Sequence, residues 1–102
     1  MTTQPTIDHT QVEAFMGKVM TDTSGMAVTI MASLGDRLGL FQNLAYGPAT
    51  SAQLATRAGL NERYTREWLC AMASSGYIVY DPANACFTLP PEHIPVLAQE
   101  AR

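Results

Sequence analysis

The fold is decided by residues 50–89, TSAQLATRAGLNERYTREWLCAMASSGYIVYDPANACFTL. Thr50 and Gln53 have the spacing of a capping box, in which a hydroxyl and an amide three residues later satisfy opposite backbone N–H groups. Gly59 can end this helix in the left-handed conformation, and Asn61 can cap the next helix. The stretch therefore predicts two helices joined by a short turn. The residues expected to face inward are Leu54, Ala55 and Ala58 in the first helix and Leu60 in the turn.

The second helix of this pair is expected to end before Gly76 and to lead into a β-hairpin. Residues 77–80 and 86–89 are rich in β-formers, and the intervening Asp-Pro-Ala-Asn at 81–84 has the composition of a turn. A helix, a turn, a second helix and a hairpin in this order predict a winged helix. The expected inward face of the second helix consists of Tyr64, Trp68, Leu69, Met72 and Ala73.

Apolar residues also recur at helical spacing before this unit, from Val12 to Leu38. Residues 22–25, Asp-Thr-Ser-Gly, interrupt them with short polar side chains and a glycine, which predicts a break between two helices. Gly39 can end the second of these helices, and residues 40–45 are expected to form a short helical turn. The predicted fold is mainly α with a small β-hairpin: a winged helix-turn-helix preceded by two N-terminal helices.

The composition indicates that the N-terminal helices face a partner. Of the 102 residues, 47% are apolar and only 15% are charged, which is little charge for the surface of a monomer. Several methionines lie in these helices, and flexible thioethers suit a surface that adapts to varied apolar contacts. Internal packing of the same side chains is the alternative. The predicted dimer or substrate-lid surface consists of Val12, Phe15, Met16, Val19, Met20, Met26, Ile30 and Met31.

A winged helix can also read DNA, and this alternative would use Arg63 and Arg66 to contact base edges. The charge balance disfavours it, because nonspecific affinity for nucleic acid depends on Lys and Arg. The net charge is −3 and the pI is about 5.1. Each arginine also has a glutamate four residues away, Glu67 for Arg63 and Glu62 for Arg66, so we expect two ion pairs within the helix.

The sequence contains no recognisable catalytic, cofactor-binding or metal-ligating constellation. His9 and His93 are too far apart to form a metal pair by local spacing, and Cys70 and Cys86 lack the spacing of a metal or disulfide motif. We expect both cysteines to be reduced thiols. A glycine-rich phosphate loop and a nucleophilic serine motif are also missing from the sequence.

The ends of the chain carry weaker signals. Residues 1–7 are polar and are predicted to form a flexible arm, with helical order beginning near Asp8. Residues 92–101 can form another helix, bent or restarted at Pro95 because proline lacks an N–H group. The expected location is the cytoplasm, since the sequence shows neither a secretory signal nor an apolar run long enough to span a bilayer. The absence of a closing element after Gln99 suggests a piece of a longer chain.

Several short motifs give the chain a family resemblance. They are Leu34-Gly35-Asp36-Arg37-Leu38-Gly39-Leu40-Phe41, Gly47-Pro48-Ala49-Thr50, Arg66-Glu67-Trp68-Leu69, Gly76-Tyr77-Ile78 and Leu89-Pro90-Pro91-Glu92-His93. Together, over about residues 34–97, they resemble the N-terminal winged-helix domain of class I S-adenosylmethionine-dependent methyltransferases. The resemblance implies that this module precedes a Rossmann-like domain that binds the cofactor. It also implies that the N-terminal helices dimerise and help to roof the substrate pocket.

We therefore expect a non-catalytic module, in which residues 1–7 are an arm, 8–45 dimerisation helices, 46–89 the winged helix-turn-helix and 90–102 a link to a catalytic domain. The family's cofactor-binding motif falls on no position of this chain, so S-adenosylmethionine is implied for the missing domain only. The expected partners are a second copy, that catalytic domain and a small-molecule substrate, but not nucleic acid or a membrane. A winged-helix transcriptional regulator and a free-standing dimeric adaptor are the alternatives.

Overall fold

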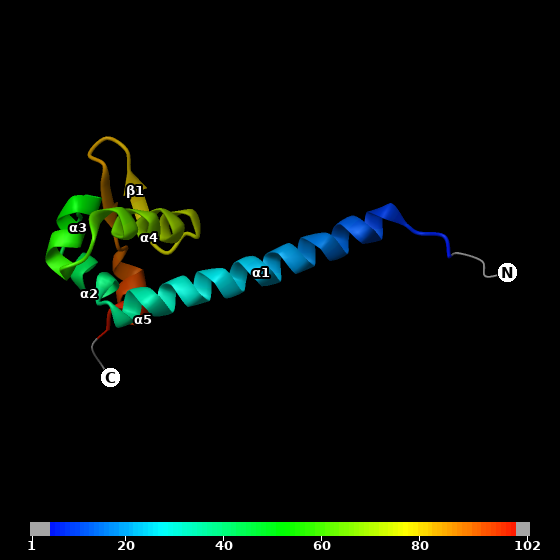
Figure 1. The fold of residues 1–102 in the computed structure, drawn as a ribbon, viewed down its shortest axis with the longest axis horizontal. Helices are drawn as coiled ribbons and strands as arrows, with labels where there is room; N and C mark the ends of the chain where they lie inside the picture. Colours follow the sequence, from blue (N-terminus) through cyan, green and yellow to red (C-terminus); the bar gives the residue numbers. More distant parts are fainter. Residues whose placement is uncertain (1–4, 100–102) are drawn as a thin grey trace.

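A long helix projects from a small winged-helix head in the computed structural model, which describes residues 5–99 (Figure 1). The long helix is α1 (His9–Arg37), and the chain measures 67 × 34 × 25 Å. The head is built from α2 (Leu40–Leu44), α3 (Ser51–Ala58), α4 (Glu62–Ser74), β1 (Val79–Asp81), β2 (Cys86–Thr88), the 3-10 helix η1 (Pro91–His93) and α5 (Ile94–Leu97).

Helix α1 is continuous over 29 residues, so the predicted break at residues 22–25 is wrong. Asp8 caps its start by accepting a hydrogen bond from the Thr10 N–H at 2.9 Å, which confirms where helical order begins. Within the predicted break, Asp22 pairs with Lys18 at 2.7 Å and the Gly25 carbonyl accepts the Thr29 hydroxyl at 2.8 Å. A mid-helix glycine costs only about 1 kcal/mol, whereas a second helix would have to nucleate again. Continuing the helix is therefore favoured.

The caps predicted for the two helices of the winged unit are confirmed. The Thr50 hydroxyl accepts from the Gln53 N–H at 3.2 Å, and the Gln53 side chain accepts from the Thr50 N–H at 2.9 Å. Gly59 has a φ of 69°, and Asn61 accepts from the Tyr64 N–H at 3.2 Å. These local hydrogen bonds set the boundaries of α3 and α4.

The inward face of α4 differs from the prediction at one position. Trp68, Leu69 and Met72 are buried as expected, but Tyr64 is 75% exposed, and Thr65 is buried instead. Thr65 lies one and two turns before Leu69 and Met72 on the same face, whereas Tyr64 lies at the edge of that face. The Thr65 hydroxyl donates to the Asn61 carbonyl at 2.8 Å, which satisfies it inside the core.

The hairpin is shorter than predicted, and it gains a third partner. Val79 pairs with Thr88, Tyr80 with Phe87 and Asp81 with Cys86 in an antiparallel register. Phe87 also exchanges two backbone hydrogen bonds with Ala49, at 2.8 and 3.1 Å. No strand was predicted at Ala49 from the sequence, because a single bridge leaves no alternating pattern. This bridge ties the wing to the start of α3.

The core lies between α2, α3, α4 and the wing, and the C-terminal segment closes it. Its largest fully buried side chains are Leu40, Phe41, Leu44, Leu54, Leu69, Met72 and Ile78. The C-terminal helix is shorter than the predicted 92–101, because α5 ends at Leu97. Of the two predicted alternatives at Pro95, a bend or a restart, the structure shows the restart: Pro95 lies in the first turn of α5. His93 Nδ1 lies 2.7 Å from the Tyr77 carbonyl, which holds this segment against the base of the wing. Residues 1–4 of the predicted arm and residues 100–102 lie outside the described residues.

Candidate interaction surface

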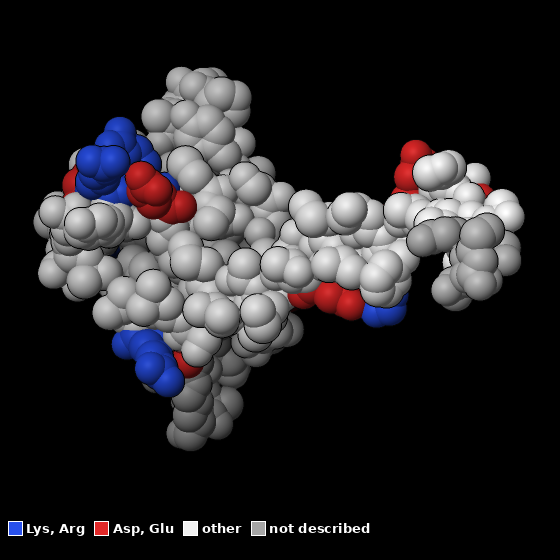
Figure 2. Space-filling view, turned by 45° about the vertical axis from the view of Figure 1, so that its right-hand side comes forward, with Lys and Arg blue, Asp and Glu red and all other residues white. Residues whose placement is uncertain are grey.

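The feature that distinguishes this molecule is an apolar stripe along α1 that the head does not cover. Every residue from Pro5 to Ala27 is exposed, and most of the projecting helix is white in Figure 2, with charges in small clusters of both signs. The stripe consists of Val12 (47% exposed), Phe15 (66%), Met16 (59%), Val19 (42%), Met20 (60%), Met26 (63%), Ile30 (61%) and Leu34 (44%). Seven of the eight predicted surface residues are in it.

The stripe and the packed face of α1 lie on different sides of the helix. Residues 12, 16, 19, 23, 26 and 30 are spaced alternately by four and three, the a/d spacing of a coiled coil, with Thr23 as the polar member. The residues that pack against the head are Val28, Ala32 and Gly35, which follow each other at four and three residues on another face. Met31, predicted to be part of the surface, is half-buried and packs against the core. The apolar stripe thus remains without cover in the monomer.

A close contact between Gly35 and Trp68 fixes the direction of α1. A Cβ atom at Gly35 would lie 2.2 Å from Cζ2 of Trp68, so only glycine lets the helix approach the indole this closely. The indole is held in place because its Nε1 donates to the Met31 carbonyl at 2.8 Å and its ring meets Phe41 edge-on, with centroids 4.9 Å apart. This anchor holds the stripe away from the head.

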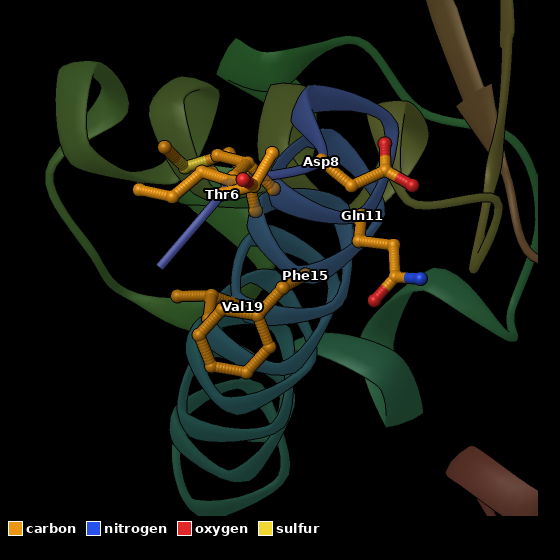
Figure 3. Close-up of a pocket in the computed structure, with 8 residues that line it drawn as sticks. Thr6, Asp8, Gln11, Phe15 and Val19 are labelled. Atoms are coloured by element: carbon orange, nitrogen blue, oxygen red, sulfur yellow. The ribbon is translucent and has the colours of Figure 1, made fainter. Parts of the chain in front are cut away.

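Shallow hollows flank the stripe near its two ends. The hollow at the N-terminal end, about 770 Å³, is lined by Thr6, Ile7, Asp8, Gln11, Val12, Phe15, Met16 and Val19. Figure 3 shows Phe15 and Val19 next to each other there, with Asp8 and Gln11 on the polar side. The hollow at the other end is lined by Thr29, Ile30, Ser33, Leu34 and Arg37. One end therefore carries an acid and the other a base.

The exposed face of α4, where a DNA-reading winged helix would make its contacts, is electrically balanced. Arg63 lies 3.7 Å from Glu67, and Arg66 lies 3.7 Å from Glu62, which confirms the two predicted ion pairs. Arg57 of α3 is engaged elsewhere: its guanidinium donates to the carbonyls of Asn43, Gly47 and Pro48 at 3.0 to 3.3 Å. A basic footprint is absent from this face, so DNA reading is not favoured.

The remaining chemistry-bearing side chains do not converge. Within residues 5–99, no group of three His, Cys, Asp or Glu side chains could hold a metal ion. Cys70 is exposed on α4 and Cys86 is half-buried on β2, and both are free thiols. Over the same residues, none of the helices combines the length and apolar character that a bilayer span requires.

No role was predicted from the sequence for Gly35, which lies in one of the family motifs, or for Arg57. Their roles depend on Trp68 and on the loop after α2, which are distant along the chain, so no local pattern could reveal them. Leu34 was omitted from the predicted surface, although its spacing of four residues from Ile30 could have found it.

Comparison with known proteins agrees with this fold. A solved structure of the methyltransferase PigF with SAH matches with a TM-score of 0.74 and 23% identity, over 82% of this chain and 24% of that chain. The chain thus spans about a quarter of the PigF chain, and the likeness establishes the fold. The comparison with curated proteins found no match. The family model of the Rv2258c-like winged HTH domain matches residues 26–99, from the last part of α1 to the end of α5, so the chain belongs to this family.

Proposed function

We propose that this chain is the non-catalytic winged-helix module of an S-adenosylmethionine-dependent methyltransferase, which dimerises through α1 and helps to cover a small-molecule substrate. Two observations support the methyltransferase part. PigF, a methyltransferase, contains the same fold in about a quarter of its chain. The sequence motifs from Leu34 to His93 resemble the winged-helix domain of such enzymes.

The observation that carries the dimerisation part is the uncovered stripe of α1. Soluble monomers rarely expose a continuous apolar patch larger than a few hundred Å². The eight large side chains of the stripe, at about 100 Å² each, would offer on the order of 800 Å², which is about the area that each partner contributes to a stable interface. A second copy of the chain provides the same stripe and therefore a matching surface.

The chain's own residues do not fit S-adenosylmethionine. Nucleotide-like cofactors bind at the carboxyl ends of parallel strands, next to a glycine-rich turn, whereas the described residues form one two-stranded antiparallel sheet. The catalytic domain that we propose as a partner would hold the cofactor, which would supply the methyl group. The module would contribute shape and apolar surface, since Lys18, Arg63 and Arg66 are each paired with an acid four residues away.

Light scattering on the 102-residue chain tests the dimer. We expect a dimer, and Met16→Glu should convert it to a monomer because it would bury a carboxylate in an apolar interface. Ala14→Glu is the matched control, because Ala14 is exposed on the opposite side of α1 and the new charge would stay in water. A wild-type chain that stays monomeric at millimolar concentration would refute dimerisation through α1.

Calorimetry with S-adenosylmethionine tests whether the winged-helix module or the proposed catalytic domain binds the cofactor. The chain alone should release no measurable heat of binding, whereas a fusion to the catalytic domain of a methyltransferase of this family should bind the cofactor. A micromolar site on the 102-residue chain would show that the module itself holds the cofactor, and the proposal would then be wrong.

A further inference from the structure

The positions of the large side chains in the apolar stripe of α1 are almost symmetric about the middle of the stripe. Thr23 lies at its centre, and large exposed side chains lie in pairs at equal distances before and after it. The pairs are Val12 with Leu34, Met16 with Ile30, and Met20 with Met26. Two copies of α1 that run in opposite directions and cross at Thr23 would therefore match each of these six side chains with another large side chain, while Phe15 and Val19 would lie opposite residues 31 and 27.

The charges at the ends of the stripe favour the same direction. Asp8 lines the hollow beside Val12 and Phe15, and Arg37 lines the hollow beside Ile30 and Leu34. An antiparallel pair of helices places Asp8 of one copy next to Arg37 of the other, at both ends. A parallel pair would place Asp8 against Asp8 and Arg37 against Arg37, and like charges repel.

We propose that two copies of this chain associate through antiparallel α1 helices, with a two-fold axis at Thr23 and the heads at opposite ends of the pair. This proposal rests on the dimerisation proposed above and specifies its geometry. A two-fold interface uses the same patch on both subunits, so the stripe of each copy would be covered by the stripe of the other. At 1.5 Å per residue, the overlap from Val12 to Leu34 would extend over about 33 Å, so each head would lie beside the N-terminal end of the other copy's α1.

Cysteine crosslinking decides the direction of the helices. In a background with Cys70→Ala and Cys86→Ala, the variants Met16→Cys and Ile30→Cys are prepared separately and then mixed. An antiparallel pair brings residue 16 of one copy to residue 30 of the other, so the mixture should give a covalent dimer under mild oxidation. Each variant alone should not, because two residues 16 would then lie about 21 Å apart along the axis. Thr23→Cys should crosslink with itself and serves as the positive control.

The outcomes separate this proposal from the one on which it rests. A dimer in light scattering, with covalent dimers from Met16→Cys alone and from Ile30→Cys alone, would overturn the antiparallel geometry and leave dimerisation intact. A monomer in light scattering would refute both proposals.

Substitution of the charges at the ends of the stripe gives a second test. Whether the dissociation constant of the dimer rises or falls depends on whether the two α1 helices are antiparallel or parallel. Arg37→Gln removes an attraction from an antiparallel dimer, so its dissociation constant at low salt should rise about two- to fivefold for each lost pair. In a parallel dimer the same change removes a repulsion, and the constant should fall, which would contradict the proposal. Asp8→Asn should have the same effect as Arg37→Gln, since asparagine preserves the helix cap and removes only the charge.

Discussion

Replacing Gly35 by alanine gives the sharpest test of how α1 is attached to the head. In a solvent-exposed helix this change is stabilising, because alanine is about 1 kcal/mol better than glycine in a helix interior. At Gly35 the new Cβ would lie 2.2 Å from Cζ2, 2.7 Å from Cε2 and 2.9 Å from Nε1 of Trp68. Real carbon atoms do not approach this closely, so either the indole or α1 must move.

The indole has little freedom to move. It donates a hydrogen bond to the Met31 carbonyl at 2.8 Å, packs edge-on against Phe41 and is only 3% exposed. Overpacking a core in this way costs about 1–3 kcal/mol and sometimes more. Because the added Cβ would clash with three atoms of the indole, we take the upper part of this range, about 2–3 kcal/mol. After subtraction of about 1 kcal/mol for the helix-propensity gain, we expect Gly35→Ala to lower the free energy of unfolding by about 1–2 kcal/mol.

Thermal and urea unfolding, followed by circular dichroism, measure this loss. A domain of this size loses about 4–8 °C of Tm per kcal/mol, so Tm should fall by roughly 5–15 °C. Gly17→Ala is the matched control: Gly17 lies in the same helix, and no described atom lies within 4 Å of a Cβ placed there. This control should raise Tm. If Gly35→Ala stabilises the chain as much as Gly17→Ala, the contact between α1 and Trp68 is not as described.

Three further predictions concern the head. Thr50→Ala removes the hydroxyl of the capping box and should lower the free energy of unfolding by about 1 kcal/mol. Thr50→Ser keeps the hydroxyl and should retain most of the wild-type stability; urea unfolding of both variants measures the difference. Arg57→Lys replaces a planar fork that reaches the carbonyls of Asn43, Gly47 and Pro48 and should cost about 1 kcal/mol, which a Tm equal to that of the wild type would contradict. Titration of a DNA duplex at two salt concentrations should show weak binding with little salt dependence, because Arg63 and Arg66 are paired with glutamates; sub-micromolar, salt-sensitive binding would refute this.

The caps show why much of the head was predictable from sequence. Thr50, Gln53, Gly59 and Asn61 act through hydrogen bonds and backbone conformations within one helical turn, so their residue types and spacing are sufficient to locate the ends of α3 and α4. The ion pairs of α4 were predictable for the same reason, since residues four apart on a helix are neighbours.

The sequence-based predictions were wrong where a local pattern competes with the cooperativity of a long helix or with contacts between residues that are distant in sequence. The polar residues 22–25 resemble a helix break, but the cooperativity of a long helix outweighs their weak preference. Tyr64 and Thr65 are both compatible with the apolar spacing of α4, and only the position of the neighbouring elements decides which of them is buried. The bridge between Ala49 and Phe87 joins two segments that are far apart in sequence, and it depends on how the chain closes.

The sequence by itself determined the winged-helix unit, the positions of its caps, the balanced charge of α4 and the presence of an apolar stripe before the head, because each of these depends on residue type and short-range spacing. Only the tertiary structure decided that α1 is a single helix, that Gly35 anchors it on Trp68 and that the stripe from Val12 to Leu34 points away from the core. The physical reason is that an apolar helical face has the same residue spacing whether it packs inside its own domain or is left exposed for contact with another chain. The direction in which α1 leaves the head distinguishes these two cases, and that direction is set by a contact between residues of two different helices.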